Sequence, residues 1–295
     1  MESVSIPWTR RFFNARCPCR SGRRAYNCCW RGGGRWEKKP VGIIPVGTTG
    51  FAHERCYLSP TGGCGTKITR EHFISRNILQ RVTKSTLKFE NVAHFFGGRP
   101  NVEIGIDAFS AKVLCDAHNS ALSVLDDEAG LAFTNIEDFA HDLAGLATAR
   151  KASHTFYLSS GIDIERWMAK VYCGLVAAGK IRGISGTTVE RETIPPCLLD
   201  ALMGRGTLTA PLGLYYHCFV GQRRKPGGFT FATIQLTDGS DAVGGLMLSL
   251  GVMNFVLVTS ESYGRVFEEP SWYRHPTFLF NVRQSGSRAA YILTY

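Results

Sequence analysis

The chain of 295 residues lacks an apolar run long enough to cross a bilayer as a helix. Its longest apolar stretch, residues 242–258, is interrupted by glycines and by Asn254, and a pair of buried strands accounts for it better. The N-terminus, MESVSIPWTRRFF, also lacks the apolar core and the small-residue cleavage site of a secretory signal peptide. We therefore predict a cytoplasmic protein with reduced thiols and no membrane contact.

Net charge is almost absent from most of the sequence. Of the formal net charge of +10, residues 1–40 carry +8, from eight Arg and two Lys against Glu2 and Glu37. A basic arm of this kind attracts polyanions, nucleic acid first and acidic protein surfaces second. The alternative is a solubilising tail. We expect the core of the protein to fold without this arm.

Cysteine is abundant, with ten residues, and four of them fall within the segment NARCPCRSGRRAYNCC. Thiolates at close spacing on two tight turns can supply the four soft ligands of a tetrahedral zinc ion without a hydrophobic core. Four protein ligands leave no open position for catalysis, so the site is expected to be structural. The spacing predicts that one zinc ion is bound by Cys17, Cys19, Cys28 and Cys29.

This segment resembles the SEC-C motif, known from the C-terminal tail of the bacterial SecA translocation motor and from many otherwise unrelated proteins. It keeps the Ser-Gly step, a basic pair, Tyr26 and the terminal Cys pair. It departs at Arg20, where the family usually has Gly. In SecA the motif binds an acidic chaperone, so the resemblance implies an adaptor for an acidic protein partner.

A second group of ligand residues is spread over residues 56–119. A Cys pair precedes the segment ITREHFIS, and a Cys-x-x-His-Asn step follows at the start of an expected helix from about His118. This arrangement resembles HNH nucleases, whose ββα-metal core combines a hairpin that carries an acid-His pair with a helix that begins near an Asn. The resemblance implies a zinc ion held by Cys56, Cys64, Cys115 and His118. It departs in the first pair, whose cysteines are separated by seven residues where the family usually has two.

The resemblance also implies a catalytic set of Glu71, His72 and Asn119. Hydrolysis of a phosphodiester needs a base to activate water and a hard cation to stabilise charge on the phosphate. His72 can act as that base near neutral pH, and Glu71 and Asn119 offer oxygen donors to Mg²⁺ or a similar ion. Adjacent residues on a regular strand point to opposite faces, so Glu71 and His72 converge only where the strand twists or ends. Taken singly, His72 could be a partly buried histidine, Asn119 a helix cap and Glu71 a partner for a nearby Arg.

The expected fold class is α+β in three parts. Residues 1–40 form the basic arm with its SEC-C-type zinc motif, and residues 41–130 form the HNH-like ββα-metal domain. Residues 131–295 form a mixed helical and antiparallel β-rich domain of unknown role, with helices expected at 136–151 and 163–180. The expected function is that of a metal-dependent endonuclease acting on nucleic acid, with DNA as the expected substrate. The alternative is a non-catalytic zinc protein that binds nucleic acid or an acidic protein partner.

Overall fold

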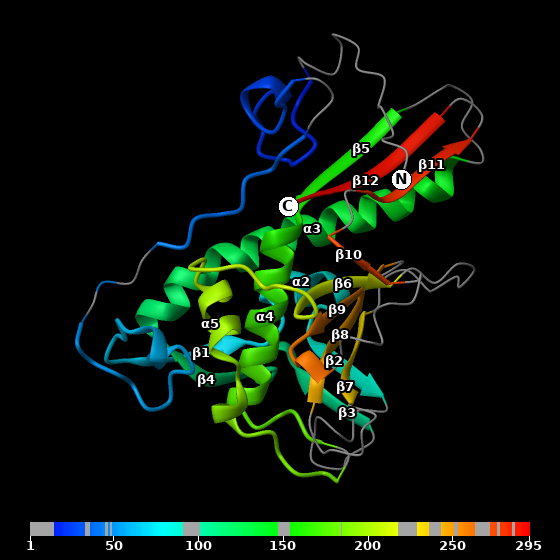
Figure 1. Ribbon diagram of the computed structural model, residues 1–295. Helices are drawn as coiled ribbons and strands as arrows, with labels where there is room; N and C mark the ends of the chain where they lie inside the picture. The colour runs from blue at the N-terminus through cyan, green and yellow to red at the C-terminus, as the bar shows by residue number, and fades with distance from the viewer. Residues whose placement is uncertain are drawn as a thin grey trace. The chain divides into compact units, whose positions relative to one another are not determined.

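Figure 1 shows the computed structural model of the chain. It describes residues 15–32, 36–44, 47, 49–90, 101–146, 154–183, 185–217, 229–235, 243–250, 253–262, 272–275, 278–284 and 287–295. Arg10, Arg11 and Arg35 of the basic arm and Cys218 lie outside the described residues. The chain divides into two compact units: unit 1 comprises residues 1–40, 131–163 and 275–295, and unit 2 comprises residues 41–130 and 164–274.

Unit 1 is built on a three-stranded sheet in the order β11-β12-β5. β5 (His154–Ser160) runs parallel to β12 (Ser287–Thr294), and β11 (Phe278–Gln284) pairs with β12 in the antiparallel sense. Residues 289–293 of β12 are buried, so the central strand forms the core. The C-terminal part of α3 (Asp116–Leu146) adds Phe139, whose ring centroid lies 6.2 Å from those of Tyr157 and Tyr291.

Unit 2 begins with an antiparallel strand pair that leads directly into a helix. β1 (Ile68–His72) pairs with β4 (Ser110–Cys115), and α3 starts at the residue after β4. Between these two strands the chain forms a short helix, a second antiparallel strand pair and a 3₁₀ turn. Their bounds are α2 (Arg76–Val82), β2 (Thr86–Glu90), β3 (Asn101–Gly105) and η3 (Ile106–Ala108).

The remainder of unit 2 contains helices and a five-stranded antiparallel sheet in the order β10-β6-β9-β8-β7. The helical elements are α4 (Gly161–Ala177, in unit 2 from Ile164), η4 (Arg191–Thr193) and α5 (Pro196–Leu202). The strands are β6 (Gly213–His217), β7 (Phe229–Gln235), β8 (Val243–Leu250), β9 (Met253–Val258) and β10 (Trp272–Arg274). The α+β class with antiparallel sheets is therefore confirmed.

Within the apolar stretch 242–258, residues 243–250 form β8 and residues 253–258 form β9, and these strands pair with each other and are largely buried. This confirms the prediction of a buried strand pair. Within the residues that the structure describes, no helix has both the length and the apolar character needed to cross a bilayer.

Helix α4 carries four charged residues that are each at most 5% exposed: Asp163, Glu165, Arg166 and Lys170. The Glu165 carboxylate accepts a hydrogen bond of 2.7 Å from the backbone N–H of Leu214, and Arg166 donates one of 2.9 Å to the carbonyl of Val41. Because buried charges are tolerated only when they are paired, these contacts fix the strand β6 and the segment after residue 40 against α4.

Candidate metal and catalytic centres

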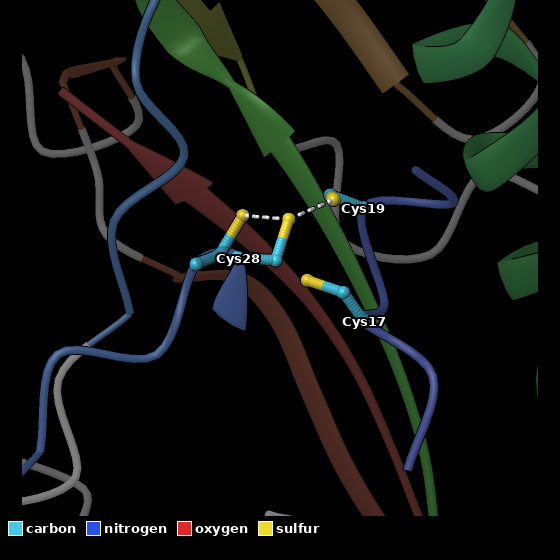
Figure 2. A group of neighbouring side chains, drawn as sticks. Cys17, Cys19 and Cys28 are labelled. Atoms are coloured by element: carbon cyan, nitrogen blue, oxygen red, sulfur yellow. Dashed lines mark hydrogen bonds between the residues drawn. The ribbon is translucent and has the colours of Figure 1, made fainter. Parts of the chain in front are cut away.

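The four cysteines of the N-terminal segment form one cluster in unit 1. The Sγ atoms of Cys17, Cys19, Cys28 and Cys29 all lie within 4.8 Å of one another. Figure 2 shows the side chains of Cys17, Cys19 and Cys28 directed toward a common centre. Cys28 Sγ lies 3.5 Å from Cys19 Sγ and 3.6 Å from Cys29 Sγ. Two thiolates bound to one tetrahedral zinc ion are separated by about 3.8 Å, so the cluster fits zinc.

The turn between the two Cys pairs explains the departure at Arg20. Cys17 N–H donates to the carbonyl of Arg23 at 2.7 Å, which closes the loop. Arg20 adopts φ 62°, in the left-handed region that glycine favours and that costs other residues on the order of 1 kcal/mol. Its side chain offsets that cost: Nε donates to Asn135 Oδ1 at 2.6 Å, and the guanidinium forms an ion pair with Asp138.

The cysteine cluster is part of the core of unit 1. Three of its cysteines, Cys17, Cys19 and Cys29, are each 3% exposed and pack with Leu158 of β5 and Ile292 of β12. The N–H of Leu158 also donates to the carbonyl of Pro18 at 3.3 Å. Removal of residues 1–40 would expose Leu158 and Ile292 on these strands. That the core folds without the arm stays a prediction.

The second group of ligand residues comes together in unit 2, at the junction of β4 and α3. Cys56, Cys64, Cys115 and His118 are all fully buried, and their ligand atoms lie within 4.8 Å of one another. His118 Nδ1 lies 3.4 Å from Cys56 Sγ, 3.7 Å from Cys64 Sγ and 3.2 Å from Cys115 Sγ. These separations match the roughly 3.6 Å between a thiolate and an imidazole nitrogen on one zinc ion. The seven-residue spacing of the first pair is accommodated by η2 (Ser59–Thr61).

Hydrogen bonds orient His118 and Cys115 so that their ligand atoms can bind a cation. Thr61 Oγ1 donates to the carbonyl of Leu58 at 2.7 Å, so its contact of 3.3 Å with His118 Nε2 is one in which the ring nitrogen donates. This fixes the tautomer that leaves Nδ1 free to bind a metal. Cys115 Sγ accepts hydrogen bonds from the N–H groups of Gly65 (3.3 Å) and His118 (3.4 Å), as a thiolate does.

The thiols of this group need a cation in order to ionise together. Burial raises the pKa of the Cys56 thiol to about 12, and the charges of Cys115 and Cys64 oppose its ionisation further. A zinc ion would offset both effects, because only deprotonated ligands bind it. Two groups of residues in the described chain can therefore each hold a zinc ion.

His72 lies at the end of β1 and faces an aspartate that the sequence reasoning missed. His72 Nε2 lies 3.6 Å from Asp107 Oδ1, and Arg76 Nη2 lies 3.3 Å from the same oxygen. Burial lowers the pKa of His72, against the opposing charge of Asp107, so the ring is neutral at physiological pH and can accept a proton. Asp107 is 77% exposed. Its position was not evident from the sequence, because pairing of β1 with β4 brings η3 beside His72.

Asn119 holds the first turn of α3 against β1. Its Nδ2 group donates to Thr69 Oγ1 at 3.0 Å and to the carbonyl of Arg70 at 3.3 Å. Both amide hydrogens are thereby used on the strand that carries His72, and the Oδ1 atom keeps its acceptor capacity. Asn119 of α3 thus contacts β1, the strand that carries His72.

Glu71 points into the interior of unit 2, away from the face of Arg70 and His72. Its side chain is 6% exposed and forms an ion pair with Lys170, which is 2% exposed. Lys170 Nζ also lies 2.5 Å from Asp126 Oδ2, and Ser75 Oγ donates to Asp126 Oδ1 at 2.5 Å. Trp167 Nε1 in turn donates to Ser75 Oγ at 2.7 Å. The prediction that Glu71 is an oxygen donor for a catalytic ion stays a prediction.

Comparison of the chain with protein-family models, with curated proteins and with solved structures finds no match.

Proposed function

We propose that the chain is a metal-dependent endonuclease whose centre lies on β1, η3 and the first turn of α3. The observation that carries the proposal is the placement of a half-buried His72 beside the exposed carboxylate of Asp107, on a strand that Asn119 clamps. The second group of ligand residues, Cys56, Cys64, Cys115 and His118, lies at the same junction of β4 and α3. Together these features support an HNH-like ββα arrangement stabilised by zinc.

His72 is the proposed general base. Its Nε2 nitrogen faces Asp107 Oδ1, so the tautomer with a proton on Nε2 leaves Nδ1 to take the proton of the attacking water. Asp107 then also stabilises the imidazolium that forms. Nε2 is buried and has no hydrogen-bond partner among the described residues, and rotation of the exposed Asp107 side chain would supply one.

A divalent ion such as Mg²⁺ would supply charge stabilisation for the scissile phosphate and the leaving oxygen. Such ions take one or two carboxylates and keep several waters. Asp107 and the Oδ1 atom of Asn119 are the donors that this face offers, and Arg70 and Arg76 supply cationic groups for phosphate. Glu71 can join this set only if its contact with Lys170 opens.

Nicking of supercoiled plasmid by the zinc-loaded chain with added Mg²⁺ or Mn²⁺ tests the proposal. His72→Ala should lower the rate on the order of 10² to 10⁴ while zinc content and fold stay unchanged. The matched control is His141→Ala, because the His141 side chain is 91% exposed in unit 1. The proposal fails if the wild-type chain cleaves no DNA or RNA with Mg²⁺, Mn²⁺ or Ni²⁺, or if His72→Ala cleaves as fast as wild type.

The second candidate function is a non-catalytic zinc protein that binds nucleic acid or an acidic protein. Arg16, Arg23 and Arg24 on the N-terminal cysteine segment favour it, since all three are exposed and the described residues record no ion pair for them. Such cations bind phosphates or acidic side chains non-specifically. A salt titration of binding to DNA separates this role from catalysis, because Arg23→Ala with Arg24→Ala should reduce the salt dependence and leave the rate of the bound complex unchanged.

A further inference from the structure

Unit 2 contains a cavity that is separate in its residues from the zinc ligands and from the proposed catalytic set. Its volume is about 600 Å³. Tyr172 of α4, Cys197 of α5 and Val243 of β8 line it, together with residues 187–190 and residues 259–261. β8 starts where its antiparallel partner β9 ends, so the cavity opens at one end of the five-stranded sheet. A volume of this size is typical of sites for small organic ligands.

The walls of the cavity are fixed by backbone hydrogen bonds. Thr259 N–H donates to the carbonyl of Gly244 at 2.8 Å, which joins the ends of the two strands. Residues 187–190 are held in the same way: Gly183 N–H donates to the carbonyl of Thr187 at 2.9 Å, and Val189 N–H donates to that of Ile181 at 3.0 Å. A ligand would thus enter a largely preformed site and lose less free energy to ordering of the protein.

The lining combines an apolar floor with hydroxyl groups and charge of one sign. Tyr172 and Val243 are buried at 3% and 7% exposure and form apolar surface. The hydroxyl groups come from Thr187, Thr188, Thr193, Thr259 and Ser260. Within the described residues, Glu190 and Glu261 are the only charged residues of the lining, and both are exposed.

We propose that this cavity binds a small organic cation, with an apolar body on Tyr172 and Val243 and an ammonium group between Glu190 and Glu261. The two carboxylates, the charged groups of the lining, favour a positive ligand and repel phosphates and carboxylates. The site is therefore not an extension of the nucleic-acid surface. It gives the five-stranded sheet a ligand-binding role that does not depend on the proposed nuclease activity.

Three probes of similar size test the charge preference on the full-length chain: phenethylammonium, 2-phenylethanol and phenylacetate. Calorimetry should show binding of phenethylammonium at least about ten-fold tighter than that of 2-phenylethanol, and no binding of phenylacetate. Cys197 gives an independent readout, because it is the exposed one of the cysteines that the structure describes. Bound phenethylammonium should slow its alkylation by N-ethylmaleimide, followed by peptide mass mapping.

Charge variants connect binding to the named carboxylates. Glu190→Gln and Glu261→Gln should each lower the affinity for phenethylammonium about five-fold, since each removes one partly exposed charge contact. The affinity for 2-phenylethanol should stay unchanged. Glu103→Gln is the matched control, because Glu103 is an exposed carboxylate on β3 away from the lining. The proposal is overturned if the three probes bind alike, if none binds or protects Cys197, or if the Gln variants bind phenethylammonium as wild type does.

Discussion

Lys170 of α4 and Glu71 of β1 form an ion pair in which both side chains are almost completely buried. Lys170 also pairs with Asp126 of α3, so one ammonium contacts two carboxylates and connects α4, β1 and α3. Burial disfavours the ammonium, but the two carboxylates outweigh that effect and raise the pKa of Lys170.

Removal of the cation should destabilise the fold strongly. Lys170→Met leaves two carboxylates without their cation and should lower the free energy of unfolding by about 3–5 kcal/mol. The double variant with Glu71→Gln should regain part of this loss, because Asp126 keeps its hydrogen bond from Ser75. Urea denaturation followed by circular dichroism measures both. Equal stability of the single and double variants would contradict a direct coupling of Lys170 and Glu71.

The same cluster predicts how stability depends on pH. Burial raises the pKa of Glu71 to about 7, because Lys170 is shared and cannot fully compensate two charges. The folded state therefore binds more protons than the unfolded state between the ordinary pKa of Glu and about 7. Stability from this group falls as pH rises through that interval. Glu71→Gln should flatten the change in urea midpoint between about pH 5 and about pH 7, whereas Glu103→Gln should not.

Asn119 should affect cleavage through the ion and through β1. Asn119→Ala removes an oxygen donor and two hydrogen bonds to the strand of His72. We expect a reduced nicking rate that higher Mg²⁺ concentration partly restores, in contrast to His72→Ala, which Mg²⁺ does not restore. Asp107→Asn should resemble Asn119→Ala if the carboxylate holds the ion. Full activity of both variants would remove these two residues from the proposed centre.

Metal analysis should find two zinc ions per chain. Cys56→Ser and Cys115→Ser should each remove the zinc ion of unit 2, and Cys17→Ser should remove the zinc ion of unit 1. Thr61→Val tests the fixed tautomer of His118, because it leaves Nε2 without the Thr61 acceptor. The affinity for zinc should fall about 10–100-fold at that site alone. A single zinc ion that is insensitive to Cys56→Ser and Cys115→Ser would exclude the second site.

Arg20 offers a comparison between side-chain contacts and backbone strain. Arg20→Ala loses the contacts with Asn135 and Asp138 and keeps a left-handed backbone, so it should destabilise unit 1 by about 1–2 kcal/mol. Arg20→Gly loses the same contacts but relieves the strain, and should be more stable than Arg20→Ala by about 1 kcal/mol. Thermal unfolding of the zinc-loaded variants measures the order, and the reverse order would exclude strain at this position.

Local spacing predicted the first ligand group, because four cysteines on two tight turns have few alternative structures, and the resemblance to HNH nucleases implied the second group. Long-range contacts were not predictable in this way. The helices expected from His118 and at 136–151 are one helix, α3, since Gly130 does not interrupt it and makes room for the side chain of Asn77. Lys170 and Asp107 became apparent only when the pairing of β1 with β4 and the packing of α4 placed them beside residues 71 and 72.

Helix α4 has a consequence for how the protein could be controlled. Lys170, which contacts the strand of His72, and Tyr172, which lines the cavity, are two residues apart on one helix. If a cation in the cavity shifts α4, it changes the affinity of the proposed nuclease centre for a divalent ion by some factor. Thermodynamic reciprocity then requires the divalent ion to change the affinity for the cation by the same factor. Phenethylammonium titrations with and without Mg²⁺ would therefore report on the proposed catalytic centre even where no nucleic acid is cleaved.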